Sequence, residues 1–207
     1  QLIALYDYDT DLQNNSYDVD NVTLSGANIN ANLFLPAANA NSTTEGKVAN
    51  KNNSTQKAMQ LLLGKLNLDD VKVVYNNTAV TPTKAGMDFN HLNFGKLNVD
   101  VRDFKMQNGT FAGKVKSAEI QESRGLNIQK FNTDFVYTEK QAYLKDLYLQ
   151  TPKTILRDEI VLNYDSVEQL SANPGAVKLS ANIKDSKIGF ADILNIVPTL
   201  RNTAPFN

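Results

Sequence analysis

Strict alternation of apolar and polar side chains is the feature that most constrains what this chain can fold into. From Leu66 to Ile183 the sequence predicts one strand after another, with almost no helical interruption. The clearest segment carries Val177, Leu179 and Ala181 at alternate positions, with polar residues between them. A period of two gives a strand one apolar and one polar face. Successive strands of this kind predict a mainly antiparallel sheet with one apolar and one solvated face.

Turn signals separate the predicted strands from one another, and we expect at least eight strands over the whole chain. Asp69-Asp70 separates two segments of opposite parity and predicts a β-bulge. Asn108-Gly109 predicts a tight hairpin, because both residues tolerate positive φ, and Asn173-Pro174-Gly175 predicts a second turn. The strands after the bulge are expected near residues 71–75, 87–101, 110–121, 126–137, 142–150, 154–164 and 176–184.

The N-terminal part of the chain carries weaker strand patterns. Residues 2–8 predict one strand, and residues 17–24 and 27–35 predict a hairpin with Ser25-Gly26 as its turn. Residues 36–57 are rich in Ala, Asn, Ser and Thr and predict a polar linker. The expected organisation is therefore N-terminal strands at 1–35, a linker at 36–57 and a main β domain at 58–207.

Two short segments change from strand to helical periodicity. Near residues 55–63, Ser54 is a suitable N-cap and Gly64 stands where a C-terminal cap belongs. Near residues 189–197, Phe190, Ile193 and Leu194 share a helical face. The predicted fold class is all-β and mainly antiparallel, with two short helices.

Composition excludes several functional classes. The formal net charge is −1, so electrostatics provide no case for binding nucleic acid. The absence of cysteine excludes disulfides and thiolate chemistry. No run of about 18 apolar residues is present, so no segment predicts a membrane-spanning helix. Gln1 in place of an initiator methionine predicts a processed chain or a fragment.

The only metal-like pattern is the acidic run Asp7, Asp9 and Asp11, whose spacing resembles part of a calcium loop. Leu12 stands where such a loop needs glycine, so the competing interpretation is an acidic strand end. The single histidine, His91, is expected to pack as a structural residue beside its neighbours Phe89 and Leu92 rather than to bind zinc.

The remaining charged pairs do not form a catalytic constellation. Glu122 and Arg124 predict an ion pair at a surface turn beside Gly125. Asp158 and Glu159 are adjacent on a strand, so their carboxylates are expected to face opposite sides. No nucleophile, base and acid recur at suitable spacing, so the sequence predicts a protein that is not an enzyme and needs no cofactor.

Five short motifs recur beside the predicted strands: Asp88-Phe89-Asn90-His91-Leu92, Lys116-Ser117, Glu122-Ser123-Arg124-Gly125-Leu126, Thr151-Pro152-Lys153-Thr154 and Asp192-Ile193-Leu194. Their order resembles the AsmA/TamB family in the form found in Bacteroidetes bacteria. The resemblance covers about residues 65–200, and Thr199 departs from it where the family has an acidic residue.

The resemblance implies a long, curved β-sheet folded into an open trough with an apolar inner face, often called a β-taco. It also implies a periplasmic segment of a protein anchored in the inner membrane of a Gram-negative bacterium, with the anchor outside this chain. The implied partners are phospholipid acyl chains and an Omp85-type outer-membrane protein. The implied role is to shield or conduct lipid between membranes.

Three alternatives follow for the apolar face. It lines an open lipid groove, or it is the sealed core of a closed β-sandwich in a non-catalytic secreted binding domain. In the third alternative the open edge strands pair with a client strand, as in an assembly module for outer-membrane proteins. The residues expected to line a lipid groove share the apolar parity of their strands: Leu97, Val99, Val101, Phe131, Phe135, Leu147, Leu149, Ile160, Leu162, Val177, Leu179 and Ile183.

Overall fold

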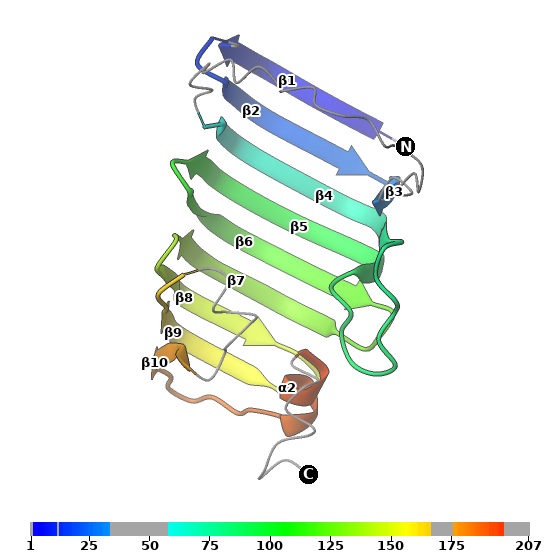
Figure 1. Cartoon of the computed structure of the whole chain (residues 1–207), viewed down its shortest axis with the longest axis vertical. Coiled ribbons are helices and arrows are strands. Elements are labelled where there is room, and N and C mark those ends of the chain that lie inside the picture. The colour runs from blue at the N-terminus through cyan, green and yellow to red at the C-terminus, as the bar shows by residue number, and fades with distance from the viewer. Residues whose placement is uncertain (1, 12, 34–57, 167–175, 197–207) are drawn as a thin grey trace, which may run out of the picture.

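The computed structural model describes residues 2–11, 13–33, 58–166 and 176–196. Within these residues all ten strands belong to one sheet, in the order β1-β2-β4-β5-β6-β7-β8-β9-β10, with β3 also paired to β4 (Figure 1). The strands are β1 (Leu2–Asp11), β2 (Ser16–Ser25), β3 (Asn28–Leu33), β4 (Gln60–Asn77), β5 (His91–Gln107), β6 (Thr110–Glu122), β7 (Asn127–Tyr137), β8 (Gln141–Gln150), β9 (Ile155–Asn163) and β10 (Lys178–Asn182).

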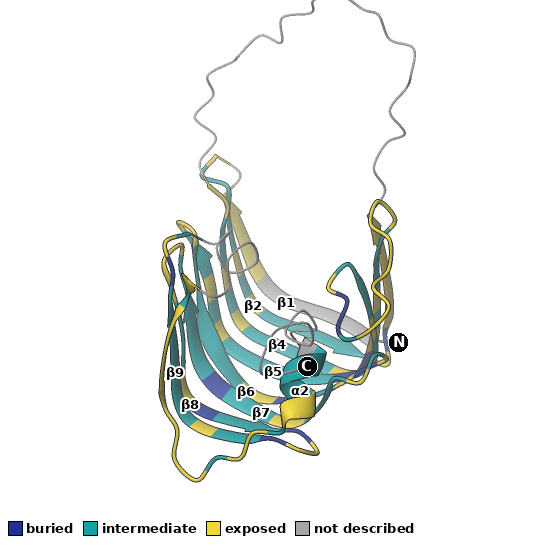
Figure 2. Ribbon diagram, turned by 60° about the horizontal axis from the view of Figure 1, so that its bottom comes forward, coloured by how far each residue is buried: buried dark blue, intermediate teal, exposed yellow. Residues whose placement is uncertain are grey.

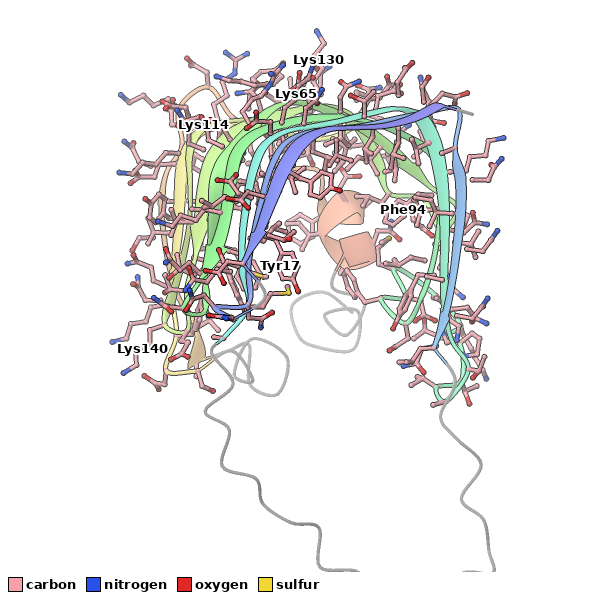
Figure 3. All side chains as sticks on the ribbon, turned by 90° about the horizontal axis from the view of Figure 1, so that it is seen from above. Tyr17, Lys65, Phe94, Lys114, Lys130 and Lys140 are labelled. Atoms are coloured by element: carbon pink, nitrogen blue, oxygen red, sulfur yellow. The ribbon has the colours of Figure 1, made fainter. Side chains whose placement is uncertain are left out.

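The sheet is open and curved, and it is antiparallel except where β2 and β3 pair with β4. Figures 2 and 3 show that the strands bend across their length, so the sheet forms a trough with a U-shaped cross-section. The predicted all-β, mainly antiparallel class and the open curved form are confirmed. The closed sandwich is wrong for the described residues, because they form one sheet with no second sheet packed against it.

Aspartates in left-handed conformation mark the points where the strand pairing shifts. Asp70 (φ 49°), Asp103 (φ 52°) and Asp146 (φ 48°) lie inside β4, β5 and β8, and the register shifts at each of them. Aspartate adopts this region more easily than most residues, and a bulge bends and twists its strand. The bulge predicted at Asp69-Asp70 is confirmed, and these irregularities account for the curvature of the sheet.

Most of the predicted strands are confirmed to within a few residues. Asn108 (φ 51°) and Gly109 (φ 72°) form the predicted tight turn between β5 and β6. β10 is shorter than predicted and ends before Ile183. The linker at 36–57 and the turn at Asn173-Pro174-Gly175 lie outside the described residues.

The predicted hairpin between the second and third strands is wrong. β2 and β3 both run parallel to β4, one after the other along its length. Between them Gly26 (φ 59°) donates its N–H to the Asp69 carbonyl at 2.9 Å, and the Ala27 carbonyl accepts from the Lys72 N–H at 2.8 Å. Gly26 therefore makes a bend between β2 and β3, opposite the bulge in β4. The chain continues in the same direction along β4 and does not reverse.

The helix predicted near residues 55–63 is also wrong where the structure describes it. β4 begins at Gln60, and Leu61 and Leu63 alternate as strand residues paired to both β2 and β5. Gly64 has no capping role: a Cβ there would lie 2.7 Å from the Asp20 carbonyl oxygen, so glycine permits the close approach of β2. The other predicted helix is confirmed as α2 (Phe190–Ile196).

The fully buried apolar cluster is small. It consists of Ala27, Val71 and Leu97, which surround the bulge in β4. Partly buried side chains pack around it, namely Leu24, Leu68, Val73, Phe94 and Ile120. No helix in the described part of the chain is long and apolar enough to cross a membrane.

Candidate functional site

The concave face of the sheet is the candidate site, and Figure 3 shows which side chains point into it. Tyr17 and Phe94 point into the trough, whereas Lys65, Lys114 and Lys130 point outward. Neighbouring residues on a strand face opposite sides, so the residues beside these lysines face inward. Pairing then extends this assignment across the sheet, because directly paired residues share a face.

One apolar row crosses seven strands in direct register. It runs from β2 to β9, so at about 4.8 Å per strand it is about 30 Å long. None of its side chains is charged or polar, and only Ala118 is buried below a tenth of its surface. We call it the Leu24 row: Leu24, Leu68, Val99, Ala118, Phe131, Leu149 and Leu156.

A second apolar row lies nearer the opposite rim of the trough and extends to β10. Its aromatic rings contact one another, with the Phe111 and Tyr137 centroids 5.8 Å apart. It too lacks charged residues, and Leu179 at its end is 64% exposed. We call it the Tyr17 row: Tyr17, Leu61, Met106, Phe111, Tyr137, Ala142, Leu162 and Leu179.

The floor between the two rows is also apolar. Phe135 pairs with Leu144, and Leu144 pairs with Ile160. Val101 pairs with Leu66 on one side and with Val115 on the other. Most side chains on this face are neither buried nor fully exposed. Two carboxylates share this face by their pairing, Asp158 with Leu147 and Glu122 with Phe94, and each accepts a backbone N–H. The two rows themselves are uncharged, and an incompletely covered apolar surface of this size is typical of a binding surface.

The structure brings together ten of the twelve residues expected to line a groove. Val177 and Ile183 are the exceptions, because they lie immediately before and after β10. The ten on the concave face are Leu97, Val99, Val101, Phe131, Phe135, Leu147, Leu149, Ile160, Leu162 and Leu179.

The convex face is polar and carries charges of both signs. Lys96 Nζ lies 3.0 Å from Glu119 Oε1, and this hydrogen bond is the main reason that the pKa of Glu119 is lowered. Arg102 Nε lies 2.6 Å from Asp100 Oδ1. Alternating charges of this kind are typical of a solvated sheet face, so the two faces differ sharply in chemistry.

A polar cluster closes one edge of the trough, and Asp88 is its centre. The Asp88 side chain is almost fully buried and accepts hydrogen bonds from the Thr83 N–H at 2.7 Å and the Asn90 N–H at 3.1 Å. His91 Nδ1 lies 3.1 Å from Asp88 Oδ2. Burial alone would raise the pKa of Asp88, but these hydrogen bonds outweigh it and lower the pKa to about 2.

His91 makes a different contact from the predicted packing between Phe89 and Leu92. Its ring is directed to Asp88, whereas Phe89 is 61% exposed and does not bury it. The predicted ion pair between Glu122 and Arg124 is wrong. Arg124 Nη1 donates to the Thr83 carbonyl at 2.7 Å, and Glu122 accepts the backbone N–H of Arg124 at 2.6 Å. The turn therefore joins the loop before β5 to the end of β6.

The same edge holds α2. The hydroxyls of Thr151 and Thr154 donate to Asp192 Oδ2 at 2.5 and 2.6 Å. The Met87 N–H donates to the Asn195 carbonyl at 2.8 Å. Four of the five motifs behind the family resemblance thus meet at one place, which the separate sequence segments did not reveal, whereas Lys116-Ser117 lies in the middle of β6. The one available signal was the recurrence of short polar residues beside strand ends.

The acidic run near the N-terminus has local partners. Asp11 Oδ1 accepts from the backbone N–H groups of Gln13 and Asn14, both at 3.1 Å, and so closes the turn between β1 and β2. Asp9 pairs with Asp18 on β2. The side chain of Asp7 lies outside the described residues. Among the residues that are described, no group of three or more potential ligands could hold a metal ion.

Comparison with known proteins identifies no relative. No family model, no curated protein and no solved structure matches the chain. The resemblance to the AsmA/TamB family therefore stays a prediction from the motifs.

Proposed function

We propose that this chain is a segment of an AsmA/TamB-like envelope protein that shields or conducts phospholipid acyl chains between membranes. The single observation that carries the proposal is the pair of uncharged apolar rows on the concave face, the Leu24 row and the Tyr17 row, which run side by side across the sheet. The Leu24 row is about as long as the hydrocarbon core of a bilayer is thick, about 30 Å.

The chemistry of the face favours hydrocarbon over other extended ligands. A peptide laid along the rows would lose hydration at its backbone N–H and C=O groups, and the row side chains offer almost no partners for them. A sugar would meet the same difficulty. An acyl chain loses nothing of this kind and gains about 0.8 kcal/mol for each buried methylene. The open mouth of the trough leaves a phospholipid headgroup in water.

A non-catalytic role is consistent with the polar cluster. Asp88, Arg124 and Asp192 are engaged by hydrogen bonds that join loops and turns. These hydrogen bonds stabilise the edge of the trough, and this structural role accounts for the cluster without a catalytic one. The proposal therefore includes no reaction and no cofactor.

The proposed location is the periplasm, with an anchor outside this chain and an Omp85-type partner. These parts follow from the family resemblance alone. A second candidate function, strand pairing with a client protein, has one specific observation in its favour. Among the described residues, β1 pairs only with β2 along its ten residues, so its other edge is available to an added strand.

A charge placed on the concave face tests the lipid proposal. The protein would be incubated with phosphatidylethanolamine vesicles that contain a photoactivatable phospholipid, and covalent capture would be measured after illumination. Phe131→Glu should reduce capture several-fold, because it places a charge in the Leu24 row. Gln129→Glu is the matched control on the same strand. A register shift breaks the alternation between Ile128 and Phe131, and Gln129 bonds to Gln150, which pairs with the outward-pointing Lys130 on the convex face.

Thermal unfolding of both variants completes the experiment. The proposal expects cooperative unfolding of Phe131→Glu, because an open trough lets the carboxylate reach water. Absence of capture by the wild-type protein would contradict it. So would an equal loss of capture in both variants.

A further inference from the structure

We propose that α2 is a displaceable end wall of the trough, held in place by Asp192 and covering the end of the Leu24 row. The inference deepens the proposed function and rests on it. It assigns a distinct role to α2: when docked it limits how far an acyl chain can extend along the trough, and when released it opens that end.

The position of α2 suits an end wall. Figure 3, which looks down the length of the trough, shows α2 between its two walls. Figure 1 shows it at the ends of β8 and β9. Leu156, the last residue of the Leu24 row, follows two residues after Thr154, whose hydroxyl bonds to Asp192. The row therefore ends close to the turn that binds α2.

The helix itself is attached through turns and loops, while the segment before it is bridged to β9 by Lys187, which pairs with Ile155. Asp192 binds the turn between β8 and β9, and Asn195 accepts from Met87 in the loop before β5. The Gly189 N–H donates to Thr154 Oγ1 at 3.0 Å. No described strand packs its backbone against α2. The helix can therefore leave by movement at residues 188–189, with the Lys187–Ile155 bridge and the pairing of the sheet intact.

A helix of this length depends on its attachment. α2 has seven residues, well below the roughly 12–15 that an isolated helix needs to be even marginally stable in water. Both hydroxyls of the turn use the same carboxylate oxygen of Asp192, and Thr151 and Thr154 are themselves buried. Loss of the Asp192 carboxylate removes two of the hydrogen bonds that hold α2 in place. It also leaves the two buried threonine hydroxyls without their acceptor.

Docked helix and acyl chain compete for one surface. Ile193 and Leu194 are half-buried in the docked helix, and the turn that holds the helix lies two residues before Leu156 at the end of the row. A ligand that binds there stabilises the released state, and release raises the affinity of that end for the ligand. Release of α2 should therefore raise lipid binding at the Leu156 end of the Leu24 row and leave lipid binding elsewhere along the row unchanged.

A reversible crosslink tests this inference. The chain has no cysteine, so Met87→Cys with Asn195→Cys introduces a single pair of thiols. It does so at two residues whose backbones are joined by a hydrogen bond, with 2.8 Å between the Met87 N and the Asn195 carbonyl oxygen. Oxidation, or a short thiol-reactive crosslinker cleaved by reductant, holds α2 docked. A photoreactive amino acid is placed either at Val99, in the middle of the row, or at Leu156, at its end. Capture of phosphatidylethanolamine from vesicles is then measured.

The crosslinked protein should capture lipid at position 99 and little at position 156. Reduction should raise capture at position 156, and Asp192→Ala should raise it several-fold without changing capture at position 99. Asp192→Asn keeps an acceptor oxygen for the two threonines and should behave more like the wild type. Retained cooperative unfolding of the Asp192→Ala protein shows that the sheet is intact.

Equal capture at position 156 in the crosslinked and reduced proteins would overturn the inference, while capture at position 99 would leave the proposed function standing. Absence of capture at position 99 in every state would overturn the proposed function and the inference with it.

Discussion

Phe104 of β5 and Phe135 of β7 meet across an intervening strand, with their ring centroids 6.5 Å apart. Gly113 of β6 lies between them and makes this approach possible. A Cβ at Gly113 would lie 3.2 Å from two carbons of the Phe135 ring and 3.3 Å from the Phe104 Cα. The floor of the trough therefore depends on a missing side chain at its centre.

Gly113→Val should lower the free energy of unfolding by about 1–3 kcal/mol, because the added methyl groups displace one or both rings. Urea unfolding monitored by circular dichroism measures the effect. Gly95→Val is the matched control: it lies in the neighbouring strand β5, and a Cβ there meets nothing within 4 Å. The control should change stability by less than about 0.5 kcal/mol. Equal effects of both substitutions would contradict the account of Gly113.

Two apolar-to-charged substitutions should separate the small buried cluster from the open face. Val71 is fully buried, so Val71→Asp places an unpaired charge away from water and should cost several kcal/mol, roughly enough to unfold the protein. Leu179 is 64% exposed, so Leu179→Asp should leave the melting temperature nearly unchanged. Differential scanning calorimetry compares the two. Unfolding by both variants would indicate a sealed core in place of an open trough.

Asp88 should make stability depend on acid. Its pKa in the folded protein is about 2, below the ordinary value of 3.8, so its ionised form is favoured by folding. The corresponding stability is present above about pH 4 and is lost as the pH falls towards 2. Asp88→Asn should destabilise the protein at pH 7, and the difference from wild type should shrink over that acidic range. Urea midpoints of both proteins between pH 2 and pH 7 measure it. A difference that is constant with pH would contradict the assignment.

The individual strands of the main sheet were predictable because each has one apolar face. Their alternation depends only on neighbouring residues, as in the segment that contains Leu97, Val99 and Val101. The bulge at Asp69-Asp70 was predictable for the same reason, since the parity reverses there. The segment around Leu61 was not, because three consecutive leucines fit a helix as well as a strand.

Contacts between segments far apart in the chain could not be predicted from the sequence. Gly26 resembles a turn residue, and only the pairing of β2 and β3 with one strand shows that it bends the edge. The Leu24 row depends on registers shifted by bulges at Asp103 and Asp146, which local patterns do not reveal. The meeting of Asp192 with Thr151 joins residues 41 positions apart. Each motif was visible alone, but their convergence on one edge was not.

A lipid-crosslinking scan along β5 decides whether the concave face of the trough holds acyl chains. A photoreactive amino acid would replace each residue from 97 to 102 in turn, and each protein would be illuminated with phosphatidylethanolamine vesicles. The account predicts a period of two, with lipid captured at positions 97, 99 and 101 on the concave face and little captured at 98, 100 and 102. Capture without alternation, or no capture at any position, would contradict the claim that this trough holds acyl chains.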